Sequence, residues 1–140
     1  MTSISRRVVV RLSGMDTPAP VRLQGFRGAT TVDRDESDEI LSATEELLQT
    51  LVAANGIDPA DVVSAIFTVT TDLVATFPAR ASRRMGWNQV AILHTTEIPV
   101  PGSLPRCIRV LVHAYSARPR DQIKHPYLRG ATVLRPDRAL

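Results

Sequence analysis

The sequence predicts an α+β fold in which a mixed β-sheet carries two main helices on one face. Two observations lead to this prediction: one long stretch repeats apolar residues at spacings of three and four, and several short runs are rich in β-branched residues. The expected order is strand, helix, strand, helix, strand, strand and an irregular end. A chain of 140 residues is sufficient for one domain with a single core.

The first expected strand is VRLQGF, which begins at Val21 and alternates in polarity. The segment before it ends in DTPAP, a composition typical of a loop. We therefore expect residues 1–20 to form a flexible N-terminal extension and residues 21–140 to form the folded domain.

Two helices are expected. The first covers residues 35–55, because its apolar residues fall on one helical face: Ile40, Leu41, Leu47, Leu48, Leu51 and Val52. Acidic side chains gather in its first turn, where the helix dipole favours negative charge, and Gly56 is a typical stop signal. The second helix covers residues 77–86, with Pro78 near its start and Gly86 at its end.

Three further strands are expected, at residues 62–70, 88–95 and 107–115. Residues 97–105 contain three prolines and a glycine and are expected to form a loop. After residue 116 the chain is expected to be irregular, with a helical turn around 121–128 and a last short strand or extended tail over 131–136. Two helices cover only one face of such a sheet, so strands this apolar predict an oligomer in which the sheets pack together.

Composition excludes several classes of function. Net charge is +3, but Arg6, Arg7 and Arg11 lie in the N-terminal extension, so we expect no nucleic-acid binding. The sequence holds no apolar run of membrane-spanning length, no phosphate-binding glycine loop, no nucleophile elbow and no metal-spaced histidine and cysteine set. We expect a cytoplasmic protein without metal or membrane association. Cys107, the only cysteine, begins an apolar strand, which favours an inert buried thiol over a nucleophile.

Arginines beside apolar strands are the strongest candidates for function: Arg27, Arg80, Arg83, Arg109 and Arg135. Arg109 stands out because nearly every residue around it is apolar, and a guanidinium in a buried strand is costly unless an anion meets it. Two interpretations remain open at this point. Glu97 is a candidate structural partner, and alternatively several arginines converge on a small substrate with more than one carboxylate.

Four segments together carry a resemblance to a known family: FRGATTVDRD, FPAR, EIPVPGSLPRCIRVL and DQIKHPYLRGATVLRPD. In this order and spacing they resemble the AroH class of chorismate mutases, over about residues 21–138. The resemblance implies a homotrimer of pseudo-α/β-barrel fold with active sites at the subunit interfaces. It also implies the rearrangement of chorismate to prephenate without a covalent intermediate, metal or cofactor.

The resemblance also implies the roles of individual residues. Arg109 is the cation that faces the ether oxygen of chorismate, Arg27 pairs with a carboxylate, and Tyr127 gives its hydroxyl to a carboxylate. Glu97 accepts a hydrogen bond from the ring hydroxyl, and the same wall of the pocket is lined by Leu93, His94, Thr95 and Thr96.

The remaining residues implied by the resemblance close the pocket: Phe77, Arg80 and Arg83 from a neighbouring subunit, and Leu134 and Arg135 from a mobile C-terminal segment that starts at about residue 130. The sequence departs from the family pattern at two of these positions. His94 stands where a cysteine is often found, and Arg80 stands where a lysine is common.

The leading hypothesis is therefore a monofunctional chorismate mutase that serves phenylalanine and tyrosine biosynthesis. The alternative is a non-catalytic trimeric protein that binds a small carboxylate metabolite.

Overall fold

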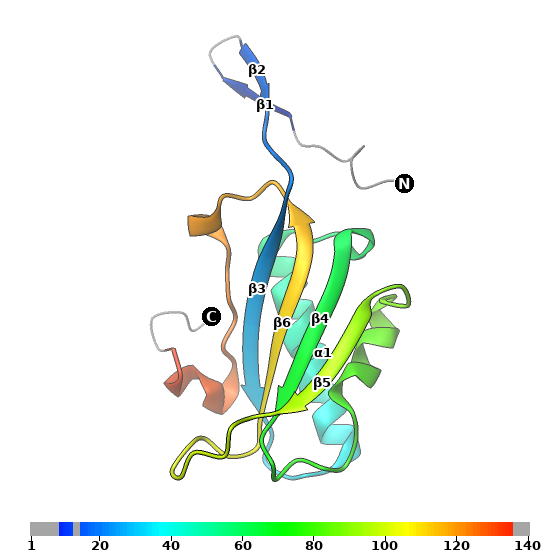
Figure 1. Cartoon of the computed structure of the whole chain (residues 1–140), viewed down its shortest axis with the longest axis vertical. Helices are drawn as coiled ribbons and strands as arrows, with labels where there is room; N and C mark the ends of the chain where they lie inside the picture. The colour runs from blue at the N-terminus through cyan, green and yellow to red at the C-terminus, as the bar shows by residue number, and fades with distance from the viewer. Residues whose placement is uncertain (1–8, 13–14, 136–140) are drawn as a thin grey trace.

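A computed structural model describes residues 9–12 and 15–135 of the chain. Its centre is a mixed four-stranded sheet in the order β3-β6-β4-β5 (Figure 1). The strands are β3 (Arg22–Thr31), β4 (Val62–Val69), β5 (Ala91–Thr96) and β6 (Cys107–Ser116). β6 is antiparallel to both of its neighbours, β3 and β4, whereas β4 and β5 are parallel. β3 runs further than the expected VRLQGF, because all ten of its residues pair with β6.

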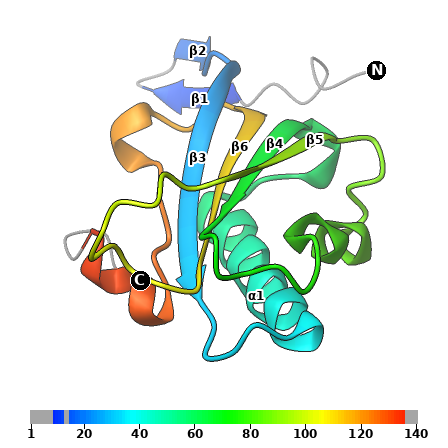
Figure 2. The ribbon, with the colours of Figure 1, turned by 60° about the horizontal axis from the view of Figure 1, so that its bottom comes forward.

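Two helical segments lie on one face of this sheet, as Figure 2 shows: α1 (Ser37–Asn55) and the 3-10 helix η3 (Pro78–Met85). The predicted fold class is confirmed. α1 ends where Gly56 adopts a left-handed conformation (φ 62°) and its N–H donates to the carbonyl of Val52. None of the helices in the described part of the chain is long and apolar enough to cross a membrane.

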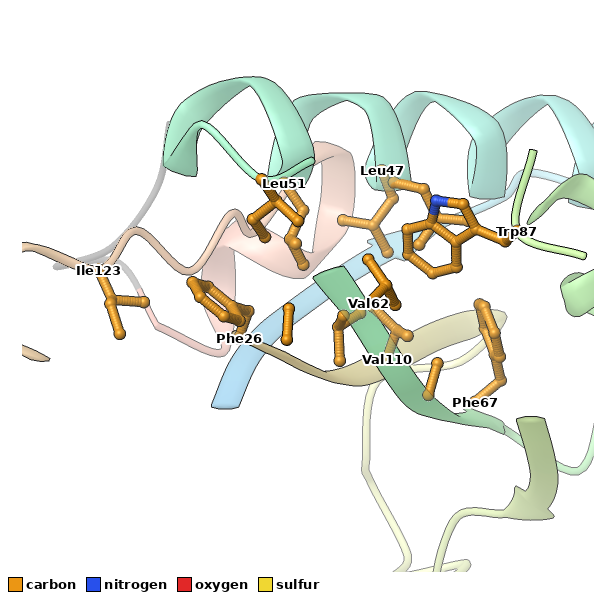
Figure 3. Packing of buried hydrophobic residues seen from close by; sticks show 13 residues of the cluster. Phe26, Leu47, Leu51, Val62, Phe67, Trp87, Val110 and Ile123 are labelled. Carbon is orange, nitrogen blue, oxygen red and sulfur yellow. The ribbon is translucent and has the colours of Figure 1, made fainter. Parts of the chain in front are cut away.

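The main core lies between the sheet and these helices (Figure 3). Alternation along the strands sends Phe26, Phe67 and Val110 to this side, where they meet Leu47 of α1 and Trp87 after η3. Each of these five side chains is almost fully buried. The alternate residues of the same strands face the other way, onto what we call the open face of the sheet.

No helix lies over the open face in Figure 2, and several apolar side chains on this face are exposed. Leu23 is 53% exposed, Tyr115 40% and Leu93 70%. Leu23 and Tyr115 are paired across β3 and β6, so they form one apolar patch at that end of the sheet. An uncovered sheet face of this kind is what the sequence predicted.

The outer edge of β3 is covered by the segment 123–128, which carries no regular secondary structure. The N–H of Arg27 donates to Nδ1 of His125 (2.9 Å) and the N–H of Ala29 donates to the carbonyl of Pro126 (3.0 Å). In return, the N–H of Leu128 donates to the carbonyl of Ala29 (2.9 Å). This segment therefore acts as a partial fifth strand and fixes the position of the tyrosine inside it.

The C-terminal end of the described chain differs from expectation. A strand or extended tail over 131–136 was the wrong prediction for residues 131–133, which belong to the 3-10 turn η5 (Arg129–Val133). A contact distant in sequence explains the turn, because the N–H of Gly130 donates to Oγ1 of Thr31 (3.0 Å). At the other end, β1 (Val9–Leu12) and β2 (Met15–Pro18) pair as a small separate sheet. Two further 3-10 turns are η2 (Pro59–Asp61) and η4 (Arg120–Gln122).

Packing against β3 leaves no room for a side chain at Gly28. A Cβ there would lie 2.9 Å from Cδ1 of Leu47 and 3.2 Å from the carbonyl oxygen of Pro126. We expect Gly28→Ala to lower the free energy of unfolding by about 1–3 kcal/mol, measured by urea denaturation at fixed protein concentration.

Gly25→Ala is the matched control on the same strand, since its Cβ would meet Cδ1 of Leu111 at an ordinary 3.6 Å. It should change the free energy of unfolding by no more than about 0.5 kcal/mol. Equal effects of the two substitutions would contradict the close packing described at Gly28.

Candidate active site

A hollow of about 290 Å³ on the open face brings together three of the predicted site residues, Arg27, Arg109 and Tyr127. Thr68 and Leu111 are also part of its lining. The register explains the convergence, because Arg109 of β6 lies opposite Ala29 of β3 and Thr68 of β4. We call this hollow the open-face pocket.

Arg109 is held by Glu97 in a two-pronged ion pair. Its Nε donates to Oε2 of Glu97 (2.8 Å) and its Nη2 donates to Oε1 (3.0 Å). The hydroxyl of Thr68 also donates to Oε2. The Arg109 side chain is 46% exposed and that of Glu97 is 20% exposed. The guanidinium is therefore fixed in direction, half open to solvent, and met by the acid that the sequence offered as its structural partner.

Each member of this ion pair stabilises the charged form of the other. The hydrogen bond from Arg109 lowers the pKa of Glu97, burial works against that, and the Thr68 hydroxyl lowers it further. The hydrogen bond to Glu97 raises the pKa of Arg109 in turn. Both groups are consequently charged at neutral pH, and Nη1 of Arg109 is left without a partner among the described residues.

Arg27 and Tyr127 complete the open-face pocket from the β3 side. Arg27 is exposed, and its backbone is anchored by the bond to His125. Tyr127 is almost fully buried, since its segment pairs with β3 at Ala29 and its ring packs with Ala131. Two cationic side chains and a phenol thus meet beside an apolar wall, which suits a small anion with an apolar body.

A second hollow, of about 490 Å³, lies beside η3 and is lined by Phe77, Arg80, Arg83 and His94. We call it the β5-edge pocket. It shares no lining residue with the open-face pocket. These four residues are the ones expected to close or line the substrate pocket, yet in a single chain they form a surface of their own.

His94 explains why the two pockets are separate. It pairs with Phe67 across β4 and β5, so it points to the helix side of the sheet, away from Arg109. Its ring stacks on Phe67 (5.7 Å between centroids) and contacts Phe77 (5.2 Å). Its Nε2 accepts the backbone N–H of Ala79 (3.2 Å), so the ring holds the start of η3 against β5.

The other expected wall residues divide between the two sides of β5. Leu93 and Thr95 pair with open-face residues of β4, whereas Thr96 alternates to the same side as His94. Leu134 is partly exposed just after η5, and its N–H donates to the carbonyl of Ala131 (3.0 Å). Arg135 is the last described residue.

Thr68 is the site residue that sequence reasoning missed. A signal for it existed, since alternation along VVSAIFTVT puts it on the face opposite Phe67. What the sequence alone did not supply was the strand order that sets it beside Arg109.

The described residues contain no group of three or more histidine, cysteine, aspartate or glutamate side chains placed to hold a metal ion. Cys107 is buried, and burial raises the pKa of its thiol to about 11, which makes it a poor nucleophile at neutral pH.

The geometry therefore defines a class: a small α+β protein whose open sheet face holds a fixed arginine, Arg109, beside Arg27 and Tyr127, an arrangement suited to a small carboxylate. Comparison with known proteins identifies the class more closely. The chain belongs to the chorismate mutase type I family, whose model matches residues 23–138.

Two chorismate mutases and one solved structure are similar to this chain over nearly their whole length. A chorismate mutase AroH of Thermus thermophilus is 49% identical over 116 residues, which cover 82% of this chain and 95% of that protein. A chorismate mutase AroH of Bacillus subtilis (strain 168) is 44% identical over 119 residues, covering 84% and 94%. The solved structure of a chorismate mutase from Clostridium thermocellum has a TM-score of 0.77 at 48% identity and covers 79% of this chain and 98% of that one.

His94 generates a prediction about pH. Burial lowers its pKa below the ordinary value of 6.5, so the unfolded chain binds more protons than the folded chain as the pH falls below about 6.5. Stability should therefore decrease with falling pH in that window and level off below the lowered pKa. His94→Gln keeps an acceptor for Ala79 and should remove this component, as measured by urea denaturation at pH values from 7.5 down to about 5. Parallel curves for the two proteins would contradict the lowered pKa of His94.

Proposed function

We propose that this chain catalyses the intramolecular rearrangement of chorismate to prephenate. The observation that carries the proposal is the guanidinium of Arg109, fixed in direction by Glu97 next to Arg27 and Tyr127 in one small hollow. Chorismate has two carboxylates, a ring hydroxyl and an enolpyruvyl ether, and a hollow with several cationic donors matches that distribution of charge. The family and the AroH relatives support the same substrate.

The reaction needs two things from the protein. The flexible enolpyruvyl arm has to be folded over the ring, and the ether oxygen, which gains negative charge as its bond to carbon breaks, has to meet a positive donor. Arg109 supplies that donor. Because Glu97 already holds Nε and Nη2, we assign Nη1, which has no partner within residues 9–12 and 15–135, to the ether oxygen and the neighbouring carboxylate.

The other groups orient the substrate. Arg27 and the hydroxyl of Tyr127 bind carboxylates, and Glu97 accepts the ring hydroxyl. No covalent intermediate is required, since bonds are made and broken within one molecule. The raised pKa of Cys107 agrees with this, because its thiol is not a competing nucleophile at neutral pH.

The complete site, in our proposal, forms between copies of the chain in a homotrimer. The open-face pocket supplies Arg27, Arg109 and Tyr127, and Glu97 joins them through its ion pair with Arg109. The β5-edge pocket of a neighbouring copy supplies Phe77, Arg80 and Arg83. Two features support assembly: the pockets are separate in one chain, and the open face exposes apolar side chains that another copy would cover. The C-terminal segment with Leu134 and Arg135 would then cover the entrance.

We further propose that the enzyme works in the cytoplasm, in the biosynthesis of phenylalanine and tyrosine. The direct test is to add the purified protein to chorismate and follow the loss of the ultraviolet absorbance of the substrate together with the appearance of prephenate. Binding of chorismate without turnover would instead favour a non-catalytic carboxylate-binding protein.

Arg109→Lys tests the charge-stabilising role. An ammonium is a point charge that cannot hold Glu97 with two prongs and also reach the ether oxygen, so we expect kcat to fall by about 10²–10³-fold. Arg27→Ala is the comparison, because a residue that binds a carboxylate equally in ground and transition states should mainly raise KM. Steady-state kinetics of both variants, with circular dichroism as the check on folding, decide the assignment, and an unchanged kcat for Arg109→Lys would remove it.

Co-expression of two inactive variants tests the shared site. Arg109→Ala and Arg83→Ala disable different halves, so a mixed trimer retains one site in which both halves are intact. We expect activity to reappear in the mixture, measured as chorismate turnover after the two differently tagged chains are purified together. Arg109→Ala mixed with Glu97→Ala is the control that should stay inactive, since both changes fall in the same half. No recovery in the first mixture would place the whole site in one chain.

A further inference from the structure

Thr68 occupies an unusual place beside the ion pair. It lies on β4, between the strand that carries Arg109 and the strand that ends just before Glu97. Its partners across the sheet are Arg109 on β6 and Thr95 on β5. β4 is hydrogen-bonded to a strand on each side, so the backbone that carries the Thr68 hydroxyl is fixed in position.

The hydroxyl of Thr68 and Nε of Arg109 both donate to Oε2 of Glu97. A carboxylate oxygen has about two acceptor positions, so Oε2 is fully used. From the described part of the chain, Oε1 receives one hydrogen bond, from Nη2 of Arg109 (3.0 Å), which leaves one acceptor position open. The two oxygens of Glu97 are therefore not equivalent, and Thr68 is the group that makes them different.

We propose that Thr68 is a positioning residue: by saturating Oε2 it fixes the rotation of the Glu97 carboxylate, so that Oε1 accepts the substrate hydroxyl while Arg109 stays aimed at the reacting oxygen. This inference rests on the proposed function, because it gives Thr68 its effect through Glu97 and Arg109. Thr68 itself need not touch the substrate.

Without the hydroxyl, the carboxylate loses its third donor. Oε2 then has an open acceptor position as well, so either oxygen can take the substrate hydroxyl, and only the two bonds from Arg109 still orient the carboxylate. The same loss removes one of the hydrogen bonds that lower the pKa of Glu97, so its protonation should shift to higher pH.

Several charged or titratable groups lie near Glu97 and are the same in the wild type and in the Thr68 variants. The charged and titratable neighbours are Arg109 and Cys107 on β6, Asp72 in the turn after β4, and Arg27 and Tyr127 in the open-face pocket. The thiol of Cys107 has a pKa of about 11 and stays neutral under assay conditions.

The test compares two variants. Thr68→Val replaces the hydroxyl by a methyl group of similar size, whereas Thr68→Ser keeps a hydroxyl at this position. For Thr68→Val we expect kcat for chorismate to fall by about tenfold, the scale of one hydrogen bond to a charged group, and the acidic limb of the kcat profile to move to higher pH. Thr68→Ser should return both towards the wild type. Thr50→Val is the control, because that hydroxyl bonds only to the backbone of Glu46 within α1.

A second readout needs no substrate. A ¹³C-NMR titration of the Glu97 side-chain carboxyl should show a higher pKa in Thr68→Val than in the wild type or in Thr68→Ser. If the wild type fails to convert chorismate, the proposed function fails, and this titration still decides whether Thr68 controls Glu97. The inference is overturned by wild-type kcat and pH profile in Thr68→Val, by equal impairment of the Val and Ser variants, or by an unmoved Glu97 titration.

Discussion

The ion pair between Arg109 and Glu97 is the interaction on which the site depends. Its two members come from β6 and from the end of β5, and β4 separates those strands in the sheet. The Glu97 carboxylate therefore extends over β4 to bind the Arg109 guanidinium, and the hydroxyl of Thr68 on β4 donates to it. An arginine on a rigid strand, held by two prongs, needs little reorganisation when charge develops nearby, which is the property that electrostatic catalysis requires.

One-sided burial is the second constraint. The main core lies between the sheet and its two helices, whereas the open face combines exposed apolar side chains with the charges of the proposed site. The same strands thus provide stability on one side and chemistry on the other. The residues that would close the pocket lie around η3, on the wrong side of the sheet to reach Arg109 in the same chain. One chain therefore holds the two groups of residues apart, and the proposed assembly brings them together from neighbouring copies.

Local pattern predicted much of this structure. The spacing of Ile40, Leu47 and Leu51 gave α1 to within two residues, and β-branched runs gave the strands. What failed was set by contacts distant in sequence: β3 extends because β6 pairs with its whole length, and the turn at 129–133 is held by Thr31. For the site, the residues alone singled out Arg109 as a cation in an apolar strand. The roles of the other residues came from the family resemblance, and Thr68 needed the strand order.

The segment that covers the outer edge of β3 has a further consequence. An uncovered edge strand invites pairing with strands of other molecules and is a common start of aggregation. Here the bonds of Arg27 and Ala29 to residues 125–128 block that edge, and the same segment carries Tyr127 into the pocket. The same segment therefore covers the edge of β3 and places Tyr127, so a change that released it would expose that edge and empty one wall of the open-face pocket together.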